Sequence, residues 1–129
     1  MKKITLLIYF VCILAYSQTP ITDANFQTAI NTCLTTNSID GLCTSSEYGA
    51  MPSWDVSQVT NMSEAFAGRT SFNADISAWN VDNVTNMFYM FTGASSFNQN
   101  IGSWNVSNVI DMSYLFVGAT SFNQDIGDW

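Results

Sequence analysis

The chain has 129 residues, enough for one domain, and it combines 47% hydrophobic residues with only 10% charged residues and no histidine. Its formal net charge is −7, and it becomes −9 once Lys2 and Lys3 are removed, because ten acidic residues then face one basic residue, Arg69. Such an acidic surface repels phosphate backbones and anionic lipid, so nucleic acid and anionic membranes are not expected partners.

Residues 1–17 have the features of a secretory signal peptide. Two lysines precede an almost wholly apolar run over residues 4–14, and Ala15-Tyr16-Ser17 supplies the small residues that a signal peptidase recognises. The apolar run is shorter than the ~20 residues that span a membrane. We therefore expect cleavage between Ser17 and Gln18, and a mature chain that is secreted or located at the cell surface.

Residues 18–53 do not follow the repeat described below and predict an N-terminal helical cap. Thr22 or Asp23 can serve as the N-cap of a helix. The apolar residues that follow share one helical face at the expected spacing: Phe26, Ile30, Cys33 and Leu34. That face needs a partner, and the open end of the first repeat is the obvious one, since the end of a repeat stack exposes apolar side chains and unpaired backbone.

Cys33 and Cys43 are the two cysteines that remain after the signal peptide. In an exported protein such a pair predicts a disulfide, which here would tie the loop after the helix to the helix itself. Two unpaired buried thiols are the alternative. The pair makes a poor zinc site without a histidine or a third thiol, so we expect no metal and no cofactor.

Tryptophan recurs every 25 residues, at Trp54, Trp79, Trp104 and Trp129. Residues 54–78, 79–103 and 104–128 form three complete copies with ten identical positions, in the pattern W-x-V-x-x-V-x-x-M-x-x-x-F-x-G-x-x-S-F-N-x-x-I-x-x. A fixed period of roughly 20–50 residues is typical of a solenoid. Because Trp129 opens a fourth copy that does not continue, we expect the chain to be a fragment of a longer protein.

The constant apolar positions predict one shared core, because a single 25-residue coil cannot bury them alone. We expect an α+β solenoid: a right-handed stack of coils with short parallel strands and short helical turns, closed at its N-terminal end by the helical cap. Gly68, Gly93 and Gly118 are expected to adopt the left-handed conformation that ends such a turn.

The copies WNVDNVTNMFYMFTGASSFNQNIGS and WNVSNVIDMSYLFVGATSFNQDIGD resemble the repeat of the BspA-type leucine-rich-repeat surface proteins. The resemblance extends over residues 54–129, and the first copy departs from it at Ala65, Arg69, Ala74 and Ser77. It implies a leucine-rich-repeat type of solenoid in a bacterial protein that is secreted or displayed at the surface. It also implies a protein-binding or adhesive role.

Three repeated positions are candidate sites. Asn73, Asn98 and Asn123 are expected to form a structural ladder that satisfies backbone groups, with a ligand-binding polar stripe as the alternative. The tryptophans at 54, 79, 104 and 129 are expected to pack within the stack, with a sugar-stacking platform as the alternative. Two residues beyond the asparagines, the following side chains form a possible outward ligand face: Asp75, Asn100 and Asp125. A calcium site shared between coils and a solvated acidic face without a ligand are the alternatives.

The sequence offers no recognisable catalytic machinery. It contains no histidine and, after the signal peptide, no lysine. Its acidic residues are scattered along the repeats rather than paired in the way glycosidases pair them. We therefore expect a non-catalytic module that recognises a protein or a glycan. The alternatives are a structural spacer that displays another domain and a fragment of a carbohydrate-active enzyme.

Overall fold

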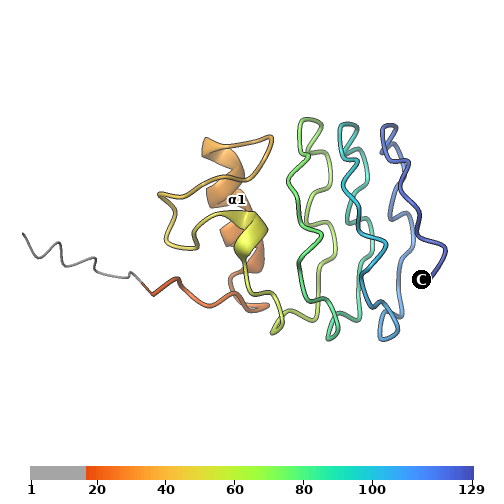
Figure 1. The fold of residues 1–129 in the computed structure, drawn as a ribbon, viewed down its shortest axis with the longest axis horizontal. Coiled ribbons are helices and arrows are strands. Elements are labelled where there is room, and N and C mark those ends of the chain that lie inside the picture. The colour runs from red at the N-terminus through yellow and green to blue at the C-terminus, as the bar shows by residue number, and fades with distance from the viewer. Residues whose placement is uncertain (1–16) are drawn as a thin grey trace, which may run out of the picture.

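The computed structural model describes residues 17–129, so the predicted signal peptide lies almost wholly outside the described residues. The helix α1 spans Phe26–Thr36 and the short 3-10 helix η1 spans Met51–Ser53. After η1 the chain turns back and forth in successive circuits that lie side by side (Figure 1). No helix of residues 17–129 is long and apolar enough to cross a membrane.

The helix α1 buries the predicted face against the first repeat. Phe26, Ile30, Cys33 and Leu34 are buried, together with Ala29. The N-cap is Asn25, so the prediction of Thr22 or Asp23 was wrong. The carboxylate of Asp23 instead accepts hydrogen bonds from Thr60 and Asn61 of the first repeat, so it is not available to the helix end.

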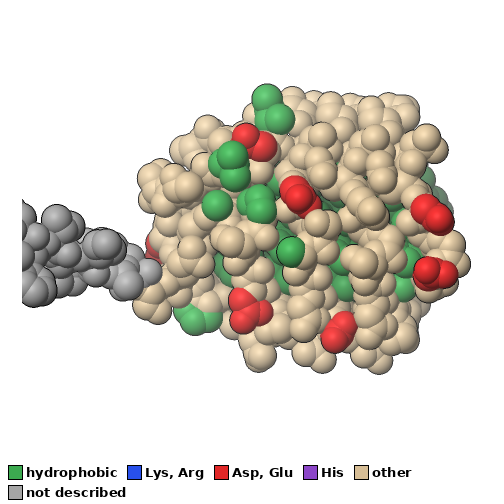
Figure 2. All heavy atoms as spheres, viewed as in Figure 1, with side chains coloured by type: hydrophobic (Ala, Val, Ile, Leu, Met, Phe, Trp, Pro, Cys, Tyr) green, Lys and Arg blue, Asp and Glu red, His purple; other side chains and the backbone are tan. Residues whose placement is uncertain are grey.

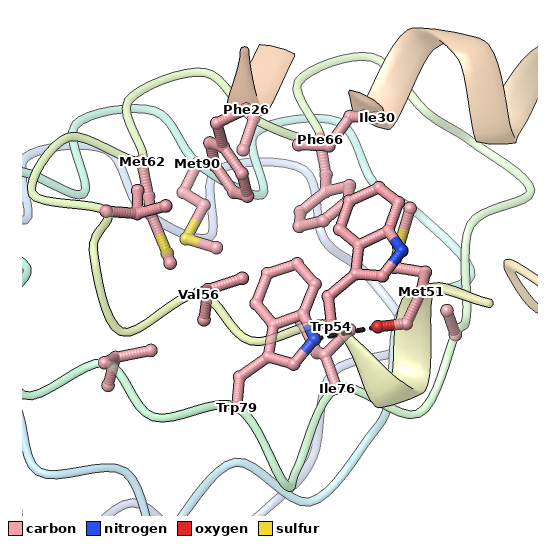
Figure 3. Close-up of a cluster of buried hydrophobic side chains, with 14 of the residues drawn as sticks. Phe26, Ile30, Met51, Trp54, Val56, Met62, Phe66, Ile76, Trp79 and Met90 are labelled. Carbon is pink, nitrogen blue, oxygen red and sulfur yellow. Dashed lines mark hydrogen bonds between the residues drawn. The ribbon is translucent and has the colours of Figure 1, made fainter. Parts of the chain in front are cut away.

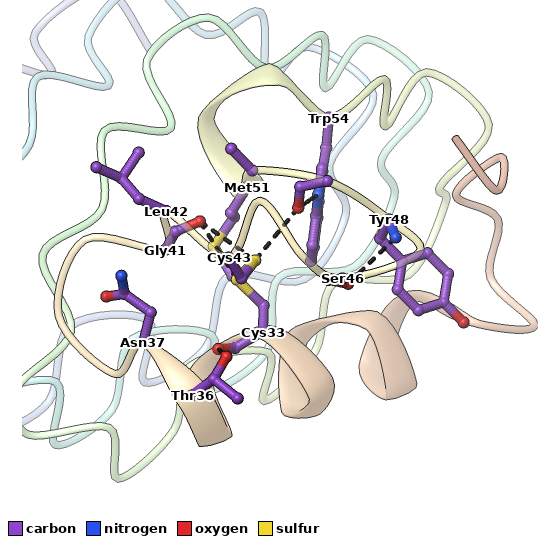
Figure 4. The surroundings of a disulfide bond; sticks show 12 residues. Cys33, Thr36, Asn37, Gly41, Leu42, Cys43, Ser46, Tyr48, Met51 and Trp54 are labelled. Atoms are coloured by element: carbon purple, nitrogen blue, oxygen red, sulfur yellow. Dashed lines mark hydrogen bonds between the residues drawn. A yellow bond between two sulfur atoms is a disulfide. The ribbon is translucent and has the colours of Figure 1, made fainter. Parts of the chain in front are cut away.

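The disulfide prediction is confirmed. Cys33, in the last turns of α1, is bonded to Cys43, and their Cα atoms lie 5.2 Å apart. Both sulfur atoms lie 3.3 Å from the carbonyl oxygen of Gly41, and both residues are buried (Figure 4). The bridge therefore fixes the loop of residues 37–43 onto α1, on the side of the cap where Met51 of η1 packs.

Each repeat is joined to the next by backbone hydrogen bonds between equivalent segments. Met62 N donates to Asn86 O at 2.8 Å, and Met87 N donates to Asp111 O at the same distance. Further along the circuit, Phe66 N donates to Met90 O at 2.9 Å. The repeats therefore stack in register.

The short parallel strands expected from the sequence are present, in residues 17–129, only as isolated bridges. Parallel bridges join Thr22 to Gln58, Asn61 to Asn86, and Asn86 to Asp111. A turn follows directly at Asn61, Asn86 and Asp111, because each of these side chains accepts the backbone N–H of the second residue after it. The extended segments of residues 17–129 are therefore too short to form continuous β-strands.

The interior of the stack is made of columns of identical side chains. Phe66, Phe91 and Phe116 stack with centroids 5.6 and 5.5 Å apart, and a parallel column links Phe72, Phe97 and Phe122 at 5.6 and 5.8 Å. Met62, Val56 and Ile76 lie in the same interior (Figure 3). Each fully buried phenylalanine contributes about 1.5–3 kcal/mol relative to an exposed one, so these columns supply much of the stability of the fold.

Two positions in each repeat adopt the left-handed backbone conformation. Gly68, Gly93 and Gly118 have φ of 70°, 72° and 73°, as the sequence predicts. The second position is occupied by larger side chains, with φ of 57° at Glu64, 56° at Tyr89 and 59° at Tyr114. A residue with a Cβ atom adopts this conformation at a cost of roughly 1–2 kcal/mol, so the second position was not predictable from residue preference.

Removing the disulfide tests how firmly the cap is held. We expect the Cys33→Ala/Cys43→Ala double variant to lose about 2–3 kcal/mol of unfolding free energy, because the unfolded chain regains the entropy of an open loop. Urea unfolding followed by tryptophan fluorescence measures the loss. Reduction of the wild-type chain should produce a similar loss and should leave the double variant unchanged. Equal stability of wild type and double variant would contradict the expectation.

Candidate functional site

Asp75, Asn100 and Asp125, the predicted ligand face, all lie on the surface of the stack. In each of them the side-chain oxygen Oδ1 accepts the backbone N–H two residues further on, at 3.1 Å from Ser77, 3.1 Å from Gly102 and 2.9 Å from Gly127. Hydrogen bonds from the side chain and then the backbone of Ser77 hold the pKa of Asp75 below its usual value. The column is therefore exposed, but its oxygens also build the turns.

The same turn recurs at two further positions of the repeat. In every case an Asn or Asp side chain accepts the N–H of the second residue after it, which is how these residues stabilise tight turns. The first position comprises Asp55, Asn80 and Asn105, and the second comprises Asn61, Asn86 and Asp111. The sequence suggests a role in backbone turns for Asn61, Asn86 and Asp111, as for the asparagines at 73, 98 and 123. Sequence reasoning missed the turns at Asp55, Asn80 and Asn105, although the recurring spacing of Asn or Asp two residues before Ser or Gly would have indicated several of them.

The asparagines at 73, 98 and 123 form a ladder along the stack. The N–H of Asn98 donates to Oδ1 of Asn73, and the N–H of Asn123 donates to Oδ1 of Asn98, both at 2.9 Å. The ladder starts on the cap, where Ile39 O accepts the N–H of Asn73 at 2.8 Å. These asparagines lie at the surface rather than pointing inward. Each side-chain oxygen accepts a backbone N–H of the next repeat, as a backbone carbonyl would.

Three of the four tryptophans are packed inside the stack, and Trp129 is partly buried at its end. Trp54, Trp79 and Trp104 are 4%, 3% and 4% exposed, and Trp54 stacks on Trp79 with centroids 6.1 Å apart. The indole N–H of Trp79 donates to Met51 O at 2.9 Å (Figure 3), and that of Trp104 donates to Ile76 O at 3.2 Å. Rings so placed offer no face to a sugar. Trp129 stacks on Trp104 at 6.4 Å, and its buried indole N–H has no partner within residues 17–129.

Asp23 closes the N-terminal end of the stack. Its Oδ1 accepts the N–H of Thr60 at 2.8 Å and that of Asn61 at 3.1 Å, while Oδ2 accepts the Thr60 hydroxyl at 2.6 Å. In the next repeat the equivalent residue, Thr85, donates its N–H to the backbone carbonyl of Thr60. A carboxylate thus replaces the carbonyl that a preceding repeat would supply. Burial alone would raise the pKa of Asp23, but the bonds from Thr60 and Asn61 outweigh it and lower this pKa.

A group of aromatic side chains lies outside the core on the second and third repeats. Phe88 and Tyr89 have ring centroids 4.2 Å apart, and Tyr89 lies 4.8 Å from Tyr114. Tyr114 is 58% exposed, while Phe88 and Tyr89 are half-buried. Sequence reasoning missed this group because its positions differ between repeats and so lie outside the constant pattern.

The surface is hollowed at a few places, one of which includes part of the predicted ligand face. A cavity of 330 Å³ is lined by Asn100, Gly102, Ser103, Asp125, Gly127 and Asp128. In residues 17–129 no three His, Cys, Asp or Glu side chains are grouped so that they could hold a metal ion. The visible face in Figure 2 is mostly uncharged, with acidic side chains scattered over it.

Residues 35–129, which contain all three repeats and the end of the cap, match the family described as Mycoplasma protein of unknown function, DUF285. The chain belongs to this family. The DUF285 match therefore covers the in-register stack, the asparagine ladder and the tryptophan column. No curated protein and no solved structure gives a significant match to the chain.

The asparagine ladder of this DUF285 chain can be tested at its middle rung. Asn98→Ala removes the acceptor for the N–H of Asn123, and we expect a loss of about 1 kcal/mol of unfolding free energy. Asn98→Asp retains Oδ1 and should lose clearly less. Urea unfolding of the two variants beside the wild type measures both. Equal losses for alanine and aspartate would show that the rung contributes nothing as an acceptor.

The pKa of Asp23 sets a pH dependence of stability. Its pKa in the folded chain is lowered, so its contribution is complete above the usual value of 3.8 and is lost as the pH falls through the lower folded value. We expect Asp23→Asn to cost about 1 kcal/mol at pH 7 and progressively less below about pH 4. Urea unfolding of both proteins at several values between about pH 2.5 and 7, which include the range where carboxyl groups titrate, measures the difference in unfolding free energy.

Asp40→Asn is the control for this experiment, because it removes the same charge from an exposed loop residue that does not contact the first repeat's Thr60 or Asn61. A stability difference between wild type and Asp23→Asn that stays constant down to the lowest pH would contradict the assignment.

Proposed function

We propose that the chain is a secreted or cell-surface recognition module, non-catalytic and built as a solenoid of the leucine-rich-repeat type found in BspA-type surface proteins. The sequence resemblance of residues 54–129 supports the finer family relation. The stacking of the repeats in register, with an apolar interior and a helical cap, is consistent with that type of architecture.

The observation that carries this proposal is the separation between constant and variable positions in the repeat. The constant aromatic and aliphatic positions lie in the interior, where they set the stack. Most positions that differ between repeats lie at the surface, such as the position of Thr60, Thr85 and Ile110, where all three side chains are exposed. One varying position lies in the core, where Ala65, Met90 and Leu115 exchange one apolar side chain for another. Surface side chains can therefore change without disturbing the backbone that displays them, which is what a recognition scaffold needs.

The pKa shifts of two surface carboxylates, Asp55 and Asp75, are opposite to the shift that a glycosidase needs. A general acid of a glycosidase needs a raised pKa. Here hydrogen bonds from Ser57 hold the pKa of Asp55 below its usual value, and those from Ser77 do the same for Asp75. Such carboxylates remain ionised at neutral pH and are poor proton donors.

A binding measurement separates recognition from the alternative of a structural spacer. We expect the purified chain to bind at least one member of a panel of immobilised proteins and glycans, with saturation in surface plasmon resonance. A spacer predicts no saturable binding to any of them. The negative surface should keep adsorption to anionic supports low, because like charges repel.

The double variant Asp75→Asn/Asp125→Asn then tests the predicted ligand face. Asparagine keeps the Oδ1 acceptor of each turn and removes the charge, so thermal stability should fall only slightly, through the weaker Ser77 hydrogen bonds to a neutral acceptor. Weaker binding than that of the control Asp55→Asn/Asp82→Asn, which removes two charges elsewhere on the surface, would assign ligand contact to the column. Equal binding by both variants would remove Asp75 and Asp125 from the ligand face.

A further inference from the structure

Phe88, Tyr89 and Tyr114 form a continuous aromatic row across two repeats. Tyr89 and Tyr114 occupy the same repeat position, and their ring planes differ by 33°. Phe88 meets Tyr114 edge-on, with centroids 6.3 Å apart and planes at 90°. The backbone holds the row in place, since the N–H of Tyr89 donates to Ser113 O at 3.0 Å.

The aromatic row belongs to the surface rather than to the core. The phenylalanine columns of the interior are 0% exposed at Phe66, Phe91 and Phe97, whereas Tyr114 is 58% exposed. Val117, which donates its N–H to Tyr114 O in the same turn, is 54% exposed. The rings of the row therefore present apolar area to solvent that the fold does not need to bury.

The backbone at the row indicates that the tyrosine side chains serve more than the turn. At its other left-handed position each repeat uses glycine, which adopts positive φ without strain. Tyr89 and Tyr114 adopt almost the same φ with a bulky side chain, which L residues rarely do. Glycine at these two positions would relieve the backbone strain. The presence of tyrosine there points to a role for its side chain.

The charge around the row defines the ligand that it suits. The third residue at this repeat position is Glu64, whose N–H donates to Phe88 O at 2.8 Å, so a carboxylate stands at one end of the row. Over residues 17–129 the chain carries ten acidic side chains against Arg69 alone, and the Arg69 guanidinium is bonded to the side chain of Asn31. A second copy of the chain would carry the same negative charge and be repelled.

We propose that the aromatic row binds a basic segment of a partner protein, with an arginine side chain stacked on the rings of Tyr89 and Tyr114 and attracted by Glu64. Aromatic faces bind guanidinium groups through cation–π contact and planar stacking. The excess negative charge concentrates cationic ligands near the surface. The inference rests on the proposed recognition function and names the chemistry of its partner.

Titration calorimetry with a ten-residue peptide of alternating arginine and glycine tests the proposal at low and at physiological salt. We expect binding that weakens as salt rises, since screening shortens the range of the attraction. The variant Tyr89→Gly/Tyr114→Gly keeps the left-handed backbone and removes both rings. It should bind the peptide about tenfold more weakly while its thermal midpoint stays the same or rises.

Two matched substitutions separate the row from general charge. Glu64→Gln should weaken peptide binding a few-fold, and Asp40→Asn, which removes the same charge from the cap loop, should not. A peptide with citrulline in place of arginine keeps the shape and loses the charge, so it should bind much more weakly. Equal binding of the citrulline peptide, or of the double glycine variant, overturns the proposal.

The remaining outcomes are also decisive. Binding of a neutral oligosaccharide that is lost in Tyr89→Gly/Tyr114→Gly, with no binding of the arginine peptide, overturns the proposal in favour of a glycan. Self-association of the wild type in sedimentation that the same variant abolishes overturns it in favour of a second copy. If the immobilised panel is bound saturably and the arginine peptide is not, this inference fails and the recognition function stands. If neither is bound, both fail.

Discussion

The stack depends on hydrogen bonds that each coil can complete only with its neighbour. Coil-to-coil pairs such as Met62 to Asn86 run along the whole array, so a coil at the end would leave backbone groups unpaired. At the N-terminal end the cap supplies the missing acceptors: the carboxylate of Asp23 for Thr60 and Asn61, and the carbonyl of Ile39 for Asn73. The cap therefore provides the hydrogen-bond acceptors that a preceding coil would provide. The disulfide between Cys33 and Cys43 keeps the loop that carries Ile39 in position.

Polar side chains in the repeats act mainly as substitutes for backbone. The asparagine ladder replaces carbonyl groups between coils, and the Asn and Asp turns replace them within a coil. This explains how a chain with no buried polar side chain among its described residues can nevertheless be rich in asparagine. A side chain that binds a ligand would have to be one that these roles leave available, as the side chains of the aromatic row are.

The repeat period, the core positions and the disulfide could be predicted from the sequence. Each follows from the identity and spacing of the residues and does not depend on where distant parts of the chain lie. Gly68 at positive φ and Cys33 paired with Cys43 are of this kind. The partner of Asp23 could not be predicted, since nothing local distinguishes a helix cap from a bond to a residue 37 positions away. The left-handed backbone of Tyr89 and Tyr114 could not be predicted either, because tyrosine on its own disfavours this conformation. Hydrogen bonds to the neighbouring coil impose it.

The asparagine ladder and the phenylalanine columns share one further property. Asn73 meets Asn98, and Phe72 meets Phe97, only because both pairs are separated by the same 25 residues. A single inserted or deleted residue inside a coil would misalign the side chains of that coil with those of its neighbours, whereas a whole added unit would misalign none. The stack can therefore accommodate the gain or loss of a whole 25-residue unit more easily than a change of one residue within a unit.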